Sequence, residues 1–516
     1  MFRLDAVEQP IASCTIARGG KTCDTVALRA LGWYWDDRGA PRPSHTISVE
    51  TIDRSSASIQ VRVAPRPVVL VHGFMSDHKT WTAYTAPGGF LARIGLKGFA
   101  VGDGNADGLI NSGDITRPKT ATKTLPENAA ALAAYIAGVK KSTHAEMVDL
   151  VAHSMGGLIS RYYVARLMQG RDVAQLMMLG SPHGGSECSG LAAALGVLGP
   201  ASLELRPAYL RQIFNRGVTR RNGVPFTMLA GNPILESFKA PCSGVPSDGV
   251  VSLDSASAIP GTVTQMSVMH TDMTRSEDVF SKFILPQLRR RVGDFSNASD
   301  TQVPAESSVP TQFTQVFTGH VEAGGAAEVE VNLDQVAIAS FALFDPSRSL
   351  VVTVRGASGK VIALNPEEHG LIKVEDPSSL LTLGYGFRNP KPGPWRITLR
   401  APPQAGADFA LSARVVGGAS LQARSSHLTP SRAQPVTLAA ALEYPGKPLT
   451  DVSMRAVIRL PSGRTETLDL QGSAAEMKAV WRAAERGIHG VDIIATARAD
   501  GLRVERTTFL ALDVQP

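Results

Sequence analysis

No run of about 18 apolar residues, the length that a membrane-spanning helix needs, occurs in this 516-residue sequence, so we predict no transmembrane segment. The first residues, Met1–Asp5, contain an early acid and no apolar stretch, and they indicate no signal peptide within the sequence given. Charged residues make up only 19 % and hydrophobic residues 43 %, a balance that excludes a disordered chain. At about 100–200 residues per domain, we expect three or four domains.

The sequence also lacks a concentration of positive charge. Lys and Arg number 52 against 46 Asp and Glu, which gives a net charge of +6. The longest basic run, Arg289–Arg291, ends a predicted helix, where cations favour the helix dipole. We therefore predict no nucleic-acid partner.

Only four cysteines are present, and none forms a C-x-x-C or Cys/His cluster that would indicate zinc. Cys14 and Cys23 flank a Gly-Gly turn, and pairing them costs the least loop closure. We predict the disulfides Cys14–Cys23 and Cys188–Cys242, with four buried free thiols as the alternative. Two disulfides would indicate an oxidising compartment, so that the protein would be secreted, periplasmic or exposed at the cell surface.

The hydropathy pattern divides the chain into segments. Residues 1–65 are predicted to form short strands, namely Trp33–Trp35, Thr46–Val49 and Ala57–Val63. In residues 66–294, apolar strands alternate with helices, which indicates a mostly parallel sheet covered on both faces, an α/β fold. The predicted strands are Val68–Val71, Met147–Val151, Leu176–Leu179, Phe226–Ala230 and Val263–Met269, and the predicted helices include Glu127–Val139 and Leu158–Met168.

The C-terminal half is predicted to be β structure. A Ser- and Pro-rich linker is expected at residues 295–310, and its composition suggests that few contacts cross it. Short strands punctuated by Gly and Pro then predict two β-sandwich domains, at residues 311–420 and 430–516, the second immunoglobulin-like. The expected strands of the first are Val316–Val321, Glu328–Leu333, Ser349–Arg355, Leu380–Tyr385, Trp395–Leu399 and Phe409–Val416.

The sharpest chemical signal is Ala-His-Ser-Met-Gly at residues 152–156. A predicted strand runs directly into Ser154, and a helix begins near Gly156. Small residues at Ala152 and Gly156 let the backbone turn tightly enough to expose the serine hydroxyl, as in a nucleophile elbow. The helix N-terminus would favour negative charge that develops there. Ser154 is therefore the predicted nucleophile.

Residues 67–290 resemble bacterial lipases and esterases of the α/β-hydrolase superfamily, close to the triacylglycerol lipase and GPI-inositol-deacylase-like branch. Besides the elbow, the buried strand Val68–Val71 ends in His72-Gly73, which in such lipases precedes a backbone donor of the oxyanion hole. The resemblance implies that the N–H groups of Phe74 and Met155 form this hole.

The same resemblance places the catalytic histidine after the last strand of the core, which corresponds to His270. The acid should lie between Ser154 and His270. Asp248, in an Asp-Gly-Val-Val segment like that of these lipases, is the choice, and Asp254 and Asp272 are the competitors.

Other histidines and a long insertion surround these motifs. His72 and His153 are interpreted as structural, and His183 as a residue of the active-site wall. Residues 185–222 form an insertion between two strands, longer than a simple crossover needs, and we expect a cap that lines an acyl pocket. An ordinary crossover helix is the alternative.

Residues 103–114 match part of an EF-hand calcium loop. The candidate ligands are Asp103, Asn105, Asp107, Asn111 and Asp114, but the twelfth position is Asp rather than Glu and the flanking segments do not read as helices. A solvated loop is the favoured interpretation. No cofactor is expected to be required.

Three functions are consistent with these motifs. The first is a serine esterase or lipase that forms an acyl-enzyme from a lipid or other acyl ester. The second keeps this chemistry but acts on polymeric esters, with the β domains binding the polymer surface. The third is an adhesin-like surface protein whose hydrolase core is inactive, and the complete set of Ser, His and Asp argues against it. The sequence indicates no oligomeric state.

Overall fold

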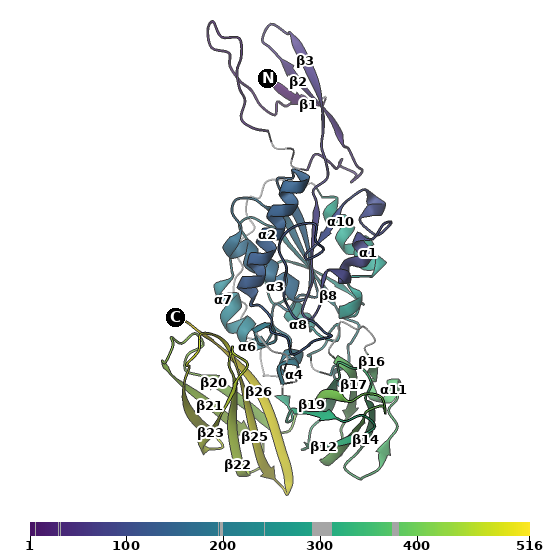
Figure 1. Cartoon of the computed structure of the whole chain (residues 1–516), viewed down its shortest axis with the longest axis vertical. Coiled ribbons are helices and arrows are strands. Elements are labelled where there is room, and N and C mark those ends of the chain that lie inside the picture. Colours follow the sequence, from purple (N-terminus) through teal and green to yellow (C-terminus); the bar gives the residue numbers. More distant parts are fainter. Residues whose placement is uncertain are drawn as a thin grey trace.

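The computed structural model describes residues 1–5, 7–28, 30, 32–194, 196, 200–241, 243–290, 312–373 and 381–516. An α/β region (residues 66–290) lies in the middle of the molecule (Figure 1). A small N-terminal module projects from one end of it, and two β regions (residues 312–416 and 420–514) lie side by side at the other end. The predicted linker at residues 295–310 lies outside the described residues.

The centre of the α/β region is a six-stranded sheet in the order β5-β4-β6-β7-β8-β9, with every neighbouring pair parallel. Its strands are continuous apolar runs, and β4, β6, β7 and β8 are buried along their whole length, as expected for a sheet with both faces covered. The strands are β4 (Val68–Val71), β5 (Gly98–Ala100), β6 (Val148–His153), β7 (Val173–Leu179), β8 (Phe226–Gly231) and β9 (Thr262–Met266). The predicted parallel sheet is confirmed, although β9 ends three residues earlier than predicted.

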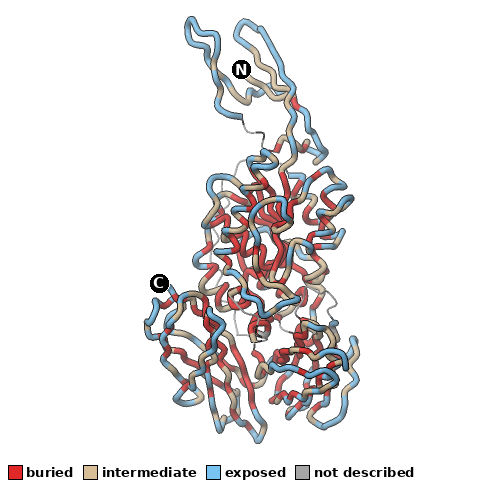
Figure 2. The backbone as a smooth tube through the Cα atoms, viewed as in Figure 1, coloured by how far each residue is buried: buried red, intermediate tan, exposed pale blue. Residues whose placement is uncertain are grey.

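Helices cover both faces of this sheet (Figure 1), and the chain between them is largely buried (Figure 2). On one face α2 and α3 share a core with Val69 and Leu150, and on the other α1, α9 and α10 enclose a core with Val68 and Met177. A Thr124 capping box starts α2, which fixes its N-terminus. The α/β-region helices are α1 (Thr82–Thr85), α2 (Leu125–Thr143), α3 (Met155–Tyr162), α4 (Cys188–Ala194), α5 (Pro200–Glu204), α6 (Pro207–Tyr209), α7 (Asn215–Gly217), α8 (Leu253–Ala256), α9 (Glu277–Val279) and α10 (Leu285–Leu288).

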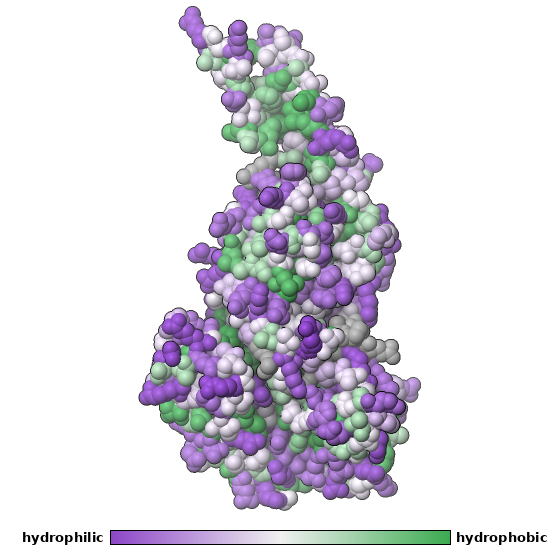
Figure 3. All heavy atoms as spheres, in the orientation of Figure 1, coloured by the Kyte–Doolittle hydropathy of each residue, from purple (hydrophilic) through white to green (hydrophobic). Residues whose placement is uncertain are grey.

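The N-terminal module is a three-stranded antiparallel sheet of β1 (Phe2–Leu4), β2 (Ser44–Glu50) and β3 (Ser56–Arg62). The disulfide Cys14–Cys23 is present, as predicted. The predicted strand at Trp33–Trp35 is wrong, because these residues form a turn that ends in a single bridge between Trp35 and Pro41. So small a sheet buries little, and apolar side chains remain on its surface (Figure 3).

The two β regions have separate hydrophobic cores. Their sheets are nevertheless joined, because the short β10 pairs with β19 on one side and with β26 on the other. The first contains β10 (Gln312–Phe313), β11 (Phe317–Val321), β12 (Ala326–Leu333), β13 (Ile338–Phe344), β14 (Val351–Arg355), β15 (Val361–Ile362), α11 (Pro366–His369), β16 (Ile372–Lys373), β17 (Leu381–Arg388), β18 (Gly393–Arg400) and β19 (Ala407–Val416). The second contains β20 (Ser420–Ser425), β21 (Pro435–Glu443), β22 (Thr450–Arg459), β23 (Thr465–Ser473), β24 (Glu476–Arg482), β25 (Gly487–Ala499) and β26 (Leu502–Val514).

Both β regions are held against the α/β region by buried polar contacts. Arg414 of β19 donates to the backbone oxygens of Ser237 and Ala240 at 2.6 and 3.2 Å. Arg206, which is fully buried, donates to the backbone oxygen of Leu510 in β26 at 3.0 Å. The expectation that few contacts join the C-terminal half to the rest is therefore wrong. Among the described residues, no helix has the length and apolar character to cross a membrane.

Candidate active site

Ser154 lies at the sharp turn between β6 and α3. Its backbone has φ = 55° and ψ = −129°, a combination that is costly for any residue with a side chain. The turn can pack closely against β4 because the residue two positions after Ser154 is glycine. A Cβ atom on Gly156 would lie 2.6 Å from the backbone oxygens of Val71 and His72, so only glycine fits there. The side chain of Ser154 reaches the cavity described below.

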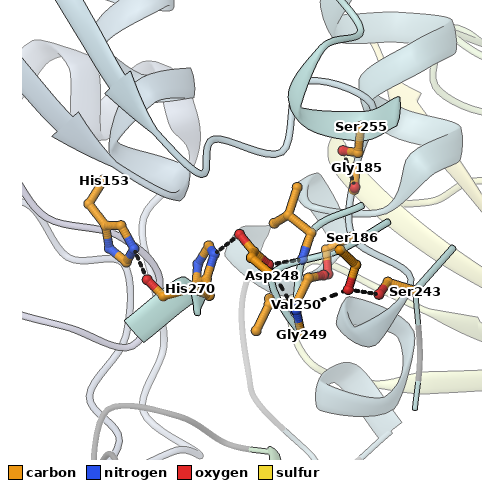
Figure 4. Close-up of polar contacts among 11 residues, drawn as sticks. His153, Gly185, Ser186, Ser243, Asp248, Gly249, Val250, Ser255 and His270 are labelled. Carbon is orange, nitrogen blue, oxygen red and sulfur yellow. Dashed lines mark hydrogen bonds and ion pairs between the residues drawn. The ribbon is translucent and has the colours of Figure 1, made fainter. Parts of the chain in front are cut away.

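His270 and Asp248, the residues predicted as base and acid, lie in direct contact. Nδ1 of His270 lies 2.8 Å from Oδ2 of Asp248, and both side chains are buried (Figure 4). The other carboxylate oxygen, Oδ1, accepts hydrogen bonds from the N–H groups of Val250 at 3.0 Å and Val251 at 2.7 Å. The carboxylate is thus fixed at both oxygens, and it orients the imidazole through Nδ1, which leaves Nε2 for proton transfer.

The competing acids are placed elsewhere. Asp254 pairs with Arg211 at 2.7 Å, and Asp272 pairs with Arg275 at 2.5 Å, both at exposed positions. The segment that carries Asp248 is also tied to the histidine through its backbone, because the N–H of His270 donates to the backbone oxygen of Asp248 at 3.0 Å. Of the three candidates, only Asp248 contacts His270 in the structure.

His153 has a larger part in this site than the sequence indicated. Its Nε2 atom lies 3.0 Å from the backbone oxygen of His270, and the two imidazole rings are 4.7 Å apart (Figure 4). Burial lowers the pKa of His153 to about 3, so the ring is neutral and Nε2 donates to that oxygen. Its position next to the predicted nucleophile, Ser154, was the only signal in the sequence, and that signal did not reveal this contact.

His183, in contrast, is not part of the cavity wall, and that prediction is wrong. The ring is fully buried, and its Nδ1 lies 3.3 Å from Nη1 of Arg161. Its backbone oxygen accepts a hydrogen bond from the side chain of Asn215 at 2.8 Å. Pro182 reaches the cavity instead. His183 therefore joins the turn after β7 to α3 and α7.

The loop after β4, which carries the predicted donor Phe74, is held by hydrogen bonds to Ser112. The hydroxyl of Ser112 donates to the backbone oxygen of Gly73 at 2.6 Å, and the N–H of Met75 donates to the backbone oxygen of Ser112 at 3.2 Å. Phe74 lies between these anchors and lines the cavity. Met155 begins α3, where the amide of a helix has no partner within the helix.

A cavity of about 90 Å³ lies beside Ser154 and His270. The expected cap contributes to its wall through Cys188, Ala192 and Leu205, and two residues of the first β region, Phe344 and Leu381, complete it. Residues of the expected cap thus line the cavity, and α4 to α7 lie in the described part of this segment. The contribution of a β region has no counterpart in the sequence motifs.

Residues 67–216 match the palmitoyl protein thioesterase family. A lipase of Bacillus licheniformis, BlEst2 in its propeptide form, superposes with a TM-score of 0.58 at 16 % identity, over 91 % of this chain and 97 % of that chain. The fold is that of an α/β-hydrolase. The mature form of BlEst2 matches 47 % of this chain and 97 % of its own at 19 % identity and a TM-score of 0.35. Together the family match and the fold support a hydrolase of the lipase, esterase or thioesterase type.

Two carboxylates of the candidate calcium loop are engaged in hydrogen bonds within the protein. Asp103 accepts hydrogen bonds from Asn105 and from the hydroxyl of Tyr135, and Asp114 accepts from Thr116 and Arg117. Within the described ranges, no cluster of three His, Cys, Asp or Glu residues is arranged to hold a metal ion. Asp103 and Asp114 thus form Asx-type hydrogen bonds within the loop.

The second predicted disulfide involves a residue outside the described ranges, Cys242. Its partner Cys188 is the first residue of α4 and lines the cavity of the α/β-hydrolase. The pairing stays a prediction. Peptide mapping without reduction should recover Cys188 and Cys242 in one linked species, and alkylation of either thiol in the native protein would contradict it.

Proposed function

We propose that this α/β-hydrolase is a serine hydrolase that cleaves carboxylic esters through an acyl-enzyme. The observation that carries the proposal is the 2.8 Å contact between Asp248 and His270 on the wall of the cavity into which Ser154 projects. Ser154 is the nucleophile, His270 is the general base, and Asp248 holds the imidazole in the reactive tautomer.

The reaction proceeds in two halves. Ser154 Oγ attacks the ester carbonyl while His270 takes its proton, and the resulting oxyanion accepts hydrogen bonds from the N–H groups of Phe74 and Met155. The intermediate collapses, the alcohol leaves with the proton from His270, and the acyl group stays on Ser154. Water, deprotonated by His270, then attacks the acyl-enzyme and releases the carboxylic acid.

The surroundings of His270 suit this role. His153, whose ring lies 4.7 Å away, is neutral because burial lowers its pKa to about 3. It therefore places no positive charge beside the imidazolium that forms in each half-reaction. The hydrogen bond from His153 to the backbone oxygen of His270 fixes the loop that carries the base.

Thioester hydrolysis is the second candidate, and the match of residues 67–216 to the palmitoyl protein thioesterase family favours it. The same nucleophile, base and oxyanion donors would serve, because a thioester also reacts through a tetrahedral intermediate. The Cys14–Cys23 disulfide supports a secreted or cell-surface location, where disulfides persist. The proposed substrates are lipid or other acyl esters, and polymeric esters bound by the β regions are the alternative.

A fluorophosphonate probe tests the proposal directly. We expect it to label wild-type protein at Ser154 and to block hydrolysis of p-nitrophenyl butyrate. Ser154→Ala should lose both labelling and turnover, and His270→Ala should lower kcat by several orders of magnitude. The matched control is Ser189→Ala, because Ser189 also lines the cavity but donates to the backbone oxygen of Ser186. Labelling that persists in Ser154→Ala, or a wild type that hydrolyses neither esters nor thioesters, would contradict the proposal.

A further inference from the structure

The cavity beside Ser154 is lined by parts of the chain that lie far apart in the sequence. Loops of the α/β region and the cap form most of the wall, and Phe344 and Leu381 of the first β region form the remainder. The exposed fractions of these two residues are 2 % and 4 %. Neither can turn toward solvent, so the wall is part of the folded interior.

The strand register brings these two side chains together. Phe344 ends β13 and Leu381 begins β17, and the two residues are paired directly across the ladder. Side chains alternate along β13, so that Phe341 packs in the core of the β region while Phe344 packs toward Met75 and Ala192 of the α/β region. The β region thus presents a defined pair of side chains to the cavity.

The β region is locked in this position. In addition to the Arg414 contacts, the hydroxyl of Ser340 in β13 donates to the backbone oxygen of Phe238 at 3.0 Å. The chains approach so closely here that a Cβ atom on Gly386 would lie 1.9 Å from the same oxygen of Phe238. A shift of the β region would break these buried hydrogen bonds, and the wall is therefore fixed relative to Ser154.

The opposite side of the cavity is fixed by the second β region. Phe509 of β26 packs against Gly190 of α4, where a Cβ atom would lie 2.5 Å from the phenyl ring. Arg206 lies over the same ring at 5.2 Å and pairs with Asp492 of β25 at 2.8 Å. Helix α4, which carries Ala192, consequently cannot withdraw to enlarge the cavity.

From this geometry we infer that Phe344 and Leu381 set the acyl-chain length that the enzyme accepts, so that the first β region is a specificity element of the active site. The inference rests on the proposed function. A cavity of about 150 Å³ is enough to hold benzene. The cavity here, about 90 Å³, holds a smaller group, and the Phe344 ring forms part of its wall. We expect wild type to prefer acetyl and butyryl over octanoyl esters.

The test is an acyl-length series of p-nitrophenyl acetate, butyrate and octanoate with the full chain. Each methylene group that an enlarged pocket buries adds about fourfold to kcat/KM. We therefore expect Phe344→Ala to raise the octanoate-to-acetate ratio of kcat/KM at least tenfold. Phe341→Ala is the matched control, because the same ring is removed from the same strand on the face that does not reach the cavity.

Several results would overturn the inference. One is an unchanged ratio in folded Phe344→Ala, and another is an equal increase for all three esters, which would show that the ring merely obstructs the site. If circular dichroism shows that Phe344→Ala does not fold, Phe344→Leu and Leu381→Ala replace it. Both are expected to raise the octanoate-to-acetate ratio by a smaller factor, and an unchanged ratio in both would overturn the inference. Loss of all hydrolysis in wild type, by contrast, would overturn the proposed function and this inference with it.

Discussion

Replacing His153 with glutamine should make the α/β region less sensitive to acid. Burial lowers the pKa of His153 to about 3 and that of His72 to about 4. Both rings are neutral in the folded protein, whereas the unfolded chain protonates them near pH 6.5. The unfolded state therefore binds more protons below that pH, and the stability that the neutral rings allow at pH 7 is lost as the pH falls.

The magnitude follows from linkage. Between pH 7 and pH 5, each histidine whose folded pKa lies below 5 lowers the free energy of unfolding by about 2 kcal/mol. This figure depends little on the folded pKa itself, because the folded ring stays neutral over the whole interval. Glutamine can still donate to the backbone oxygen of His270 but does not titrate. Between pH 7 and pH 5, His153→Gln should thus lose about 2 kcal/mol less unfolding free energy than wild type. The loss caused by His72 should remain.

Hydrogen exchange of peptides from β6 and α3, corrected for the intrinsic effect of pH, measures the opening free energy of this region alone. The quantity to compare is the change between pH 7 and pH 5 in wild type minus the same change in His153→Gln. Burial raises the pKa of Asp149 and Glu204, and their protonation opposes the loss of stability at low pH. Both carboxyls are present in wild type and in His153→Gln, so their contributions cancel in the difference. A difference below about 0.5 kcal/mol would refute the assignment of a neutral, desolvated His153.

Two further substitutions test the packing around the site. Gly73→Ala would place a Cβ atom 2.6 Å from the Cβ of Ser154. A displacement of about 1 Å at a reacting group can lower the rate about 100-fold, so we expect kcat for p-nitrophenyl butyrate to fall by that factor. An unchanged kcat would contradict the close contact between Gly73 and Ser154. Arg206→Leu removes a buried partner of Asp492 and should destabilise the protein by about 3 kcal/mol in urea titrations. Arg211→Leu, which breaks an exposed ion pair, should cost less than about 1 kcal/mol, and equal effects would count against the buried pair.

The parts of the site that the sequence predicted are those in which one residue and its immediate neighbours fix the geometry. The Ala-His-Ser-Met-Gly segment contains the small residues that its own turn requires, and the Asp-Gly-Val-Val segment supplies the N–H groups that hold Asp248. The parallel sheet was equally predictable, since continuous apolar strands between helices have few other arrangements.

The parts that could not be predicted depend on contacts between distant segments. Phe344 is an ordinary strand residue in the sequence, and only the docking of its β region brings it to the cavity. The bond from His153 to the backbone of His270 joins β6 to a loop more than one hundred residues later. The strand predicted at Trp33–Trp35 is wrong for a different reason. Aromatic residues favour strands, but in the described part of the N-terminal module no neighbouring strand pairs with these three residues.

The short strand β10 has a consequence for biosynthesis. It pairs with β19 and, through Phe313, with Thr507 of β26, so the two β regions cannot be joined until the ribosome has released the last of these strands. The hydrogen bond from Arg206 in the cap to the backbone oxygen of Leu510 likewise cannot form until Leu510 has been synthesised. The elbow at Ser154 is complete about 350 residues earlier, so it emerges from the ribosome well before the second β region that contacts the cap. Until β26 has been synthesised, Arg206 therefore lacks its acceptor at Leu510, and α4 lacks the Phe509 ring that packs against Gly190.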